Sequence, residues 1–242
     1  MTVNDVHTWT AYKEWVNKKA HEGKKFFYRG QMDAAWQLKT TFHRAVENKN
    51  ITMDDYLKKI VEDMRYHVSS HLNEIIDTSN KNEFATFLAL LRHHGFPTPL
   101  LDWTMSPYIA AYFAFRDVNR LNPLGRKTRV FVFDFESWRK AYSQPDDLKS
   151  VSPYVSVLRP FAKYNPRQIT QNCVYTITNV PDVQAHILRL TKNVDFLYQF
   201  NFSSDIKDEV MSELDLMGIS EMNLYPGLDG LCRTMKRKYF EL

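Results

Sequence analysis

Hydrophobic positions recur along this 242-residue chain with a helical spacing in some stretches and as continuous runs in others. Apolar and aromatic residues three or four positions apart predict helices over residues 8–21, 53–77 and 83–91. Short apolar runs bounded by polar residues are typical of buried strands. Such runs predict strands over residues 130–135, 174–178 and 197–202.

The C-terminal part has its own start and stop signals. Ser203 or Ser204 is a good N-cap for an amphipathic helix that reaches Met217, and the glycine after Met217 ends it. Residues 219–224 are predicted to form the last strand, and a short helix follows over 228–236.

Together these elements predict an α+β fold with a mixed sheet core. The chain contains no internal repeat, low-complexity segment or clear linker, so we expect a single domain over residues 1–242. Residues 50–92 are expected to be a helical insertion that covers the site. The region 144–153 is the best candidate for a mobile loop.

The segment from residue 100 to 115 has the most complete local signals in the chain. An apolar pair leads into a polar turn, and Ser106 then caps a helix whose first residue is a proline. Asp102, Trp103 and Thr104 are therefore expected at a helix N-terminus, where free backbone N–H groups favour an anion or phosphate. We interpret this turn as part of a site.

A second segment, an aromatic strand, ends in Arg29-Gly30 and is followed by Gln31. An arginine at the end of a buried strand is unfavourable unless its charge is paired or meets an anionic ligand. Two interpretations remain open, a structural ion pair with an acid such as Asp102 and a contact with a ligand. Gly30 would allow a close approach of the backbone to that ligand.

Composition excludes several classes of protein. The net charge of +4 permits a nucleotide or nucleic-acid partner without indicating one, because Lys and Arg are spread among acids. Two cysteines, Cys173 and Cys232, without ligands at metal spacing argue against a zinc site or any other metal centre, and against a disulfide framework. No signal peptide and no membrane-spanning run is found, so we expect a cytoplasmic protein without a membrane partner.

Three blocks of this chain resemble the FRG domain, a family named for its Phe-Arg-Gly motif. They are Phe-Tyr-Arg-Gly-Gln at 27–31 with a tryptophan downstream, His-His-Gly-Phe-Pro-Thr-Pro-Leu-Leu-Asp-Trp-Thr at 93–104, and the glycine-bounded segment 218–230. The resemblance spans roughly residues 20 to 235, nearly the whole chain.

The same blocks are more distantly similar to ADP-ribosyltransferases of the Arg/Ser-Thr-Ser/Glu type. Arg29 matches their arginine, Thr104 with Ser106 nearby matches their hydroxyl motif, and Glu221 matches their late-strand glutamate. The resemblance implies that NAD is the substrate. Arg29 would hold its pyrophosphate, and Glu221 would stabilise the positive charge that develops on the ribose. Tyr28 or Trp103 would stack on the nicotinamide.

Two departures from these patterns bear on the reaction. Pro99 stands where the FRG pattern usually has an arginine, and Ile219 stands where many transferases have the Glu or Gln that engages an acceptor. The second departure argues against protein-arginine modification in particular. It leaves NAD hydrolysis, another acceptor or no catalysis.

The FRG resemblance also raises three further ligand-binding candidates. His94, in a loop that must turn sharply, would orient the ligand or carry a proton. Arg167 and Gln171 precede the strand predicted at 174–178 and would reach the cleft. Each residue also has a purely structural interpretation.

Three functions therefore compete. The first is an NAD-consuming ADP-ribosyltransferase or NAD glycohydrolase, which would suit a toxin or a phage-defence effector with an unknown protein or nucleic-acid acceptor. The second is a non-catalytic module that binds a nucleotide or nucleic acid in the same cleft. The third is a hydrolase using His94 with Asp102, which ranks last because the chain offers it no convincing nucleophile.

Overall fold

The computed structural model describes residues 6–118, 126–191 and 194–240. Six strands form one sheet in the order β4-β5-β2-β1-β3-β6, and all pairs of neighbouring strands are antiparallel. The strands are β1 (Phe27–Gln31), β2 (Leu100–Thr104), β3 (Lys127–Phe133), β4 (Val155–Leu158), β5 (Cys173–Thr178) and β6 (Leu197–Ser203). The fold is therefore α+β as predicted, but the prediction of a mixed sheet was wrong.

The sheet consists of two three-stranded halves that meet at one point. Strands β4, β5 and β2 form one half and β1, β3 and β6 the other, with four to seven paired residues at each interface inside a half. Between the halves, β1 and β2 pair only at Tyr28 and Thr104. Beyond this pair the two strands separate, which leaves room for side chains between them.

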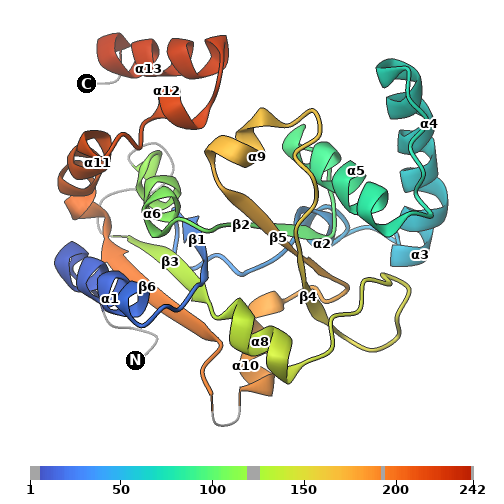
Figure 1. Ribbon diagram of the computed structural model, residues 1–242, viewed down its shortest axis with the longest axis horizontal. Helices are drawn as coiled ribbons and strands as arrows, with labels where there is room; N and C mark the ends of the chain where they lie inside the picture. The colour runs from blue at the N-terminus through green and yellow to red at the C-terminus, as the bar shows by residue number, and fades with distance from the viewer. Residues whose placement is uncertain (1–5, 119–125, 192–193, 241–242) are drawn as a thin grey trace.

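Helices cover both faces of the β1-β3-β6 half (Figure 1). One face packs against α1 (Trp9–His21), α6 (Pro107–Phe115) and α11 (Lys207–Leu216), and we call the apolar contacts on this face the first core. The other face packs against α8 (Phe135–Ala141) and α10 (Val183–Leu190) and forms the second core. Strand β3 is buried on both faces, which explains its continuous apolar sequence. Val130 and Val132 lie in the first core and Phe131 and Phe133 in the second, because successive side chains point to opposite faces.

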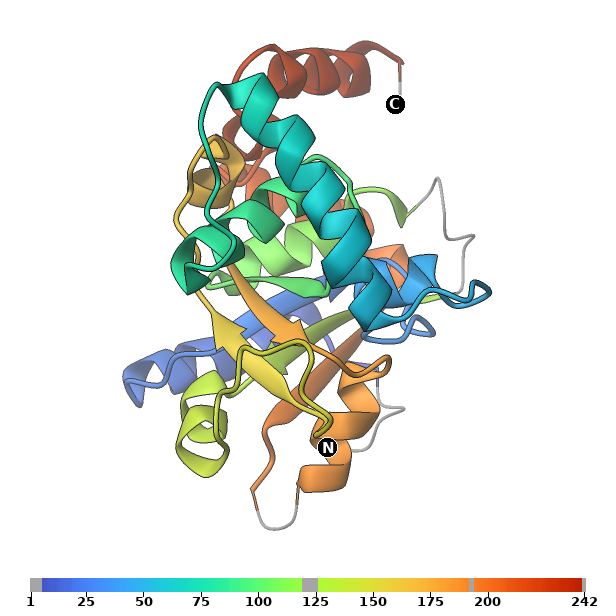
Figure 2. The ribbon, with the colours of Figure 1, turned by 90° about the vertical axis from the view of Figure 1, so that its right-hand side faces the viewer.

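The helical insertion lies over the β4-β5-β2 half of the sheet. It comprises α3 (Met53–Asp55), the π-helical turn η1 (Tyr56–Ile60), α4 (Val61–Leu72) and α5 (Lys81–His93), preceded by the short α2 (Thr41–Ala45). Figure 2 shows α4 and α5 side by side on this side of the molecule. Of these, α5 is closest to the strands, and its C-terminal end points at β2.

Two local predictions are corrected by the structure. Residues 100–104 form strand β2, so Asp102, Trp103 and Thr104 are not in a turn, although Ser106 does cap α6 by accepting from the Ile109 N–H. Residues 219–224 do not form a strand. Gly218, at φ 75°, ends α11, and the chain then forms the one-turn helix α12 (Glu221–Leu224), which buries its last residue.

The remaining elements follow β4 and β6 along the chain. The helix predicted from Ser203 or Ser204 begins as the 3-10 turn η2 (Ser204–Ile206) before continuing as α11. The short α9 (Pro166–Thr170) precedes β5, and α13 (Leu228–Phe240) is the last helix. None of the helices in the described residues is long and apolar enough to cross a membrane.

Candidate ligand-binding site

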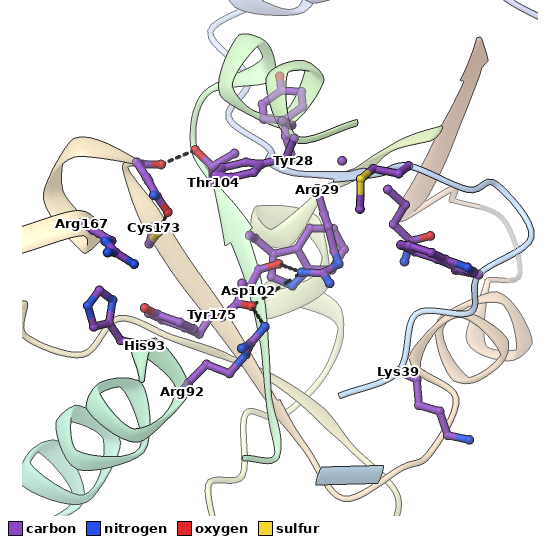
Figure 3. A pocket seen from close by; sticks show the side chains of 18 of the residues that line it. Tyr28, Arg29, Lys39, Arg92, His93, Asp102, Thr104, Arg167, Cys173 and Tyr175 are labelled. Atoms are coloured by element: carbon purple, nitrogen blue, oxygen red, sulfur yellow. Dashed lines mark hydrogen bonds and ion pairs between the residues drawn. The ribbon is translucent and has the colours of Figure 1, made fainter. Parts of the chain in front are cut away.

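A cavity of about 950 Å³ opens where β1 and β2 separate (Figure 3). Its wall carries six basic side chains and two acidic ones. The basic ones are Arg29, Lys39, Arg44, Arg92, Arg116 and Arg167, and the acidic ones are Glu47 and Asp102. The excess of positive charge favours an anionic occupant.

Arg29 bridges the gap between the two strands. Its Nη1 donates to the backbone oxygen of Asp102 at 2.6 Å and lies 3.9 Å from the Asp102 Oδ2. The predicted ion pair with Asp102 is therefore present, but as a long contact. The Arg29 Nε is buried without a hydrogen-bond partner in the described structure, so this guanidinium has a donor left for a ligand.

A second arginine contacts the same carboxylate, and a third lies within reach of its charge. Arg92, in the last turn of α5, forms a hydrogen-bonded ion pair with Asp102 through Nη2 and Oδ2. Arg44, at the end of α2, is close enough that the charges of Arg92 and Asp102 both affect its pKa. We call Arg29, Arg44, Arg92 and Asp102 the Asp102 cluster.

The pKa values of Arg29 and Arg44 reflect burial that the single carboxylate offsets only in part. Burial lowers the pKa of Arg29 to about 10, with further lowering by Arg92 and Arg44, and the nearby Asp102 only partly offsets it. Burial also lowers the pKa of Arg44. A second negative charge would stabilise both guanidinium groups, which is what a bound phosphate supplies.

The other end of the cavity is built around Tyr225, which follows α12. The guanidinium carbons of Arg116, Arg167 and Arg233 lie 5.6, 5.1 and 4.8 Å from the centre of its ring. Arg116 also forms a hydrogen bond with the Tyr225 hydroxyl. We call these four residues the Tyr225 cluster.

Carboxylates balance the arginines of the Tyr225 cluster. Arg116 pairs with Asp117 at 2.8 Å and Arg167 with Asp229 at 2.6 Å, while Arg233 lies 3.9 Å from Glu221. This end of the cavity is therefore close to electrically neutral, unlike the Asp102 cluster.

Gly30 is explained by helix packing. A Cβ at this position would overlap with the backbone of α6 at Ala110 and Ala114, so only glycine allows α6 to lie this close to β1. The backbone that approaches Gly30 is thus the helix, although Gly30 also borders the cavity. Ala110 and Ala114, two small residues of α6, are the ones that face Gly30.

The predicted hydroxyl and aromatic residues are engaged elsewhere. Thr104 donates to the Gln171 backbone oxygen at 2.8 Å and accepts from the Ser106 N–H. Trp103 is only 2% exposed and donates to Thr176 from the opposite side of β2, so it is not available to stack on a ligand. Tyr28 borders the cavity, but its ring is buried in the first core.

The histidine that reaches the cavity is His93, the last residue of α5. His94 ends α5 and is exposed, outside the cavity wall, which removes the basis for pairing it with Asp102 in a hydrolase. Burial lowers the pKa of His93, and the neighbouring His94 and Arg167 lower it further, so His93 is neutral at pH 7. A neutral imidazole offers a ligand one donor and one acceptor.

Gln31, Arg167 and Gln171 all lie on the cavity wall. The Gln31 Oε1 is buried without a partner among the described residues, whereas Gln171 donates to the Leu224 backbone oxygen at 3.1 Å. Gln171 therefore joins the wall to the end of α12, the structural role that was left open for it.

Glu221 does not meet Arg29. It begins α12 outside the cavity wall, and its carboxylate oxygens lie 3.9 Å from Arg233 and 3.8 Å from Arg237. The expectation that Glu221 lies on a strand was wrong, because that segment is a helix. The basic partners of its carboxylate are Arg233 and Arg237 of α13.

Sequence reasoning missed Arg92 and Arg116 and gave no role to Arg44. Arg92 immediately precedes the His-His pair and therefore lies in the last helical turn before β2. This position was the signal from which it could have been predicted. The FRG pattern usually has an arginine where this chain has Pro99. Arg92 nevertheless brings a guanidinium group to Asp102. Arg116 follows α6 and had no distinguishing pattern.

The described residues contain no group of His, Cys, Asp and Glu side chains arranged to hold a metal ion. Cys173 lies on the cavity wall, where burial raises the pKa of its thiol to about 12. Its thiol is therefore protonated at pH 7 and a poor nucleophile.

Comparison with known proteins finds a match to one family model. Residues 24–122 match the FRG domain, and this range includes Arg29, Arg44, Arg92 and Asp102. The Tyr225 cluster lies partly outside the match, since Arg167, Tyr225 and Arg233 follow it. No curated protein and no solved structure matches the chain.

Proposed function

We propose that this protein binds a nucleotide whose pyrophosphate lies against the Asp102 cluster. The observation that carries the proposal is that Arg29 and Arg92 contact one carboxylate, with Arg44 within reach of its charge, on the wall of a large cavity. Guanidinium groups bind phosphate oxygens through paired N–H donors and are less hydrated than ammonium groups, which suits a partly buried phosphate site.

The rest of the cavity favours a nucleotide over free phosphate. About 950 Å³ is far more than a phosphate fills and lies within the range of small-molecule sites. Trp36, which is 45% exposed, and Phe113 offer aromatic surface on the wall. A base stacks favourably on such rings.

Calorimetric titration of the full chain with three probes tests this proposal. ADP-ribose is expected to bind more tightly than inorganic pyrophosphate, and adenosine, which lacks phosphate, is expected to bind weakly. Arg29→Gln should weaken both anionic probes about tenfold or more, since it removes a charge-assisted contact. Arg159→Gln, an exposed arginine outside the cavity wall, is the matched control. Absence of binding by either anionic probe would refute the proposal.

Cleavage of NAD is the second candidate. It is favoured by the adjacency of Arg29 and Thr104 at the single pairing point of β1 and β2, which agrees with the first two blocks of the ADP-ribosyltransferase resemblance. The reaction also needs a carboxylate near the ribose. With Glu221 outside, the acids on the wall are Asp102, already paired with arginines, and Glu47, paired with Lys39 at 2.7 Å.

Nicotinamide release distinguishes the two candidates. Incubation of NAD with the purified chain, followed by chromatographic detection of nicotinamide, should leave NAD intact if the protein only binds it. Release that disappears in Asp102→Asn, and persists in Glu221→Gln, would assign the chemistry to the cavity. Release that disappears in Glu221→Gln would restore the role first expected for Glu221.

A further inference from the structure

The C-terminal helix α13 turns its apolar side away from the protein. It meets the body through Gly230, Thr234 and Arg237, the better-covered positions of the helix. Gly230 fixes this orientation, because a Cβ there would overlap with the Tyr225 backbone oxygen. Arg237 adds a hydrogen bond of 3.2 Å to the Arg116 backbone oxygen.

The exposed side of α13 carries a continuous row of apolar residues. Leu228, Leu231, Met235 and Tyr239 follow one another at intervals of three, four and four, which places them on one side of a helix. Their exposed fractions are 76%, 40%, 36% and 64%. We call these four residues the α13 stripe. An amphipathic helix in a folded domain normally turns such a row inward.

Positive charge flanks the α13 stripe. At 100° per residue, Lys236 and Lys238 lie on either side of it, and Arg233 and Arg237 lie nearer the body beside Glu221. The acidic residue of the helix, Asp229, is in the first turn and pairs with Arg167. The exposed half of α13 is thus apolar in the middle and basic at its margins.

We propose that the α13 stripe binds the surface of an anionic lipid bilayer. A helix with one apolar side, basic margins and low overall hydrophobicity lies in the plane of the bilayer interface, with its apolar residues among the acyl chains and its lysines at the headgroups. Figures 1 and 2 both show α13 at the outer end of the molecule, so a flat surface reaches it without meeting other elements first.

A second copy of the chain fits the α13 stripe less well. Pairing two such helices would bring the lysine margins of both copies together, and like charges at short distance repel. Four apolar side chains on one short helix also provide much less than the roughly 800 Å² per partner of a stable protein interface. A bilayer needs no such area, because attraction to anionic lipids adds to a modest apolar contact.

The chain offers its own probe for this contact. Cys232 is exposed and lies next to the α13 stripe, whereas burial raises the pKa of the other thiol, Cys173, to about 12. An environment-sensitive fluorophore on Cys232 of the full chain is expected to shift to shorter wavelength on adding vesicles of equimolar phosphatidylglycerol and phosphatidylcholine. Vesicles of phosphatidylcholine alone should give at least a tenfold weaker partition coefficient, roughly the effect of two surface lysines.

Unlabelled variants test whether vesicle binding depends on the α13 stripe or on any exposed apolar side chain. In vesicle co-sedimentation, Leu231→Ser with Met235→Ser should lower the partition coefficient about tenfold or more, because two apolar side chains no longer enter the interface. Ile75→Ser with Val151→Ser, which removes two side chains that are 85% and 99% exposed elsewhere, should leave it unchanged.

Two outcomes would overturn the proposal. One is equal binding by the stripe variant and the wild type, which would place any lipid contact elsewhere. The other is the absence of vesicle binding, whether the labelled chain stays monomeric or dimerises through α13 in analytical ultracentrifugation. The ADP-ribose titration is unaffected by either result, since the α13 stripe is not part of the cavity wall.

Discussion

The two arginine clusters at the cavity differ in how their charge is balanced. Around Asp102, two guanidinium groups contact one carboxylate, and the charge of a third, that of Arg44, is close enough to be affected by it. Around Tyr225, the arginines have three different acidic partners, Asp117, Asp229 and Glu221. The same residue type is thus arranged in two ways within one cavity.

This difference separates a binding arrangement from a structural one. Where acids nearly match the arginines in number, the network holds elements together, here α9 and α12 against α6 and α13. Where acids are too few, the charges repel one another in a partly buried place, and a ligand that supplies negative charge relieves the repulsion. The Asp102 cluster is therefore where an anion is expected to bind first.

The same substitution made in both clusters should give the largest contrast. Asp102→Asn removes the one carboxylate among three arginines, and we expect it to lower the free energy of unfolding by about 2–3 kcal/mol. Losing a partner of a fully buried pair costs about 3–5 kcal/mol, and the Asp102 side chain is 31% exposed. Urea denaturation measures the change.

Asp229→Asn is the control for this contrast. Its carboxylate is 65% exposed, so its ion pair with Arg167 is screened, and the expected loss is below about 1 kcal/mol. Inorganic pyrophosphate should raise the melting temperature of Asp102→Asn more than that of the wild type. Equal losses of stability in the two asparagine variants would show that the clusters do not differ in charge balance.

Acid should destabilise the folded protein through His43, which precedes Arg44 in α2. Burial lowers the pKa of His43 to about 4, so the folded protein keeps it neutral while the unfolded chain takes up a proton near pH 6.5. The contribution of His43 to the free energy of unfolding is therefore full above pH 6.5 and declines as the pH falls toward 4. The loss at pH 5 is about 2 kcal/mol.

Unfolding of His43→Gln and of the wild type at pH 7 and pH 5 measures that decline. The variant should lose less stability over this interval, by about 2 kcal/mol. His67→Gln, at a side chain that is 67% exposed, should behave like the wild type. An unchanged pH dependence in His43→Gln would assign the acid sensitivity to other groups.

The sequence allowed much of the fold to be predicted because local signals and burial agreed. The aromatic strand ending in Arg29 and the Ser106 cap of α6 are where they were expected. The interval 100–104 was misread because Asp102 interrupts its apolar run. That aspartate is tolerated in a strand because Arg29 and Arg92 meet it from outside β2.

The rest of the site depends on contacts far apart in the chain. Glu221 was expected on a strand because apolar residues surround it, but Gly218 and the burial of Leu224 and Tyr225 favour a single helical turn. No local pattern indicates that Arg92 would meet Asp102. That contact exists only because α5 ends beside β2, which is a property of the assembled fold.

Ligand binding gives a smaller contrast between the clusters than stability does. Arg92→Gln should raise the dissociation constant of ADP-ribose about tenfold, because Arg92 lies in the Asp102 cluster, where one carboxylate is present for three arginines. The Arg92 Nε is also buried without a partner in the described structure. Calorimetric titration at constant ionic strength measures the change. The variant should remain folded, since Arg29 still contacts Asp102.

Arg167→Gln should have the smallest effect, a change of about twofold or less in the dissociation constant of ADP-ribose. Arg167 also lies on the cavity wall, but its charge is already matched by Asp229 at 2.6 Å, so a bound anion gains little from it. The double variant Arg167→Gln with Asp229→Asn should then bind like the wild type. A loss as large as that of Arg92→Gln would mean that the ligand reaches the Tyr225 cluster and displaces Asp229. The excess of positive charge at Asp102 would then no longer locate the phosphate.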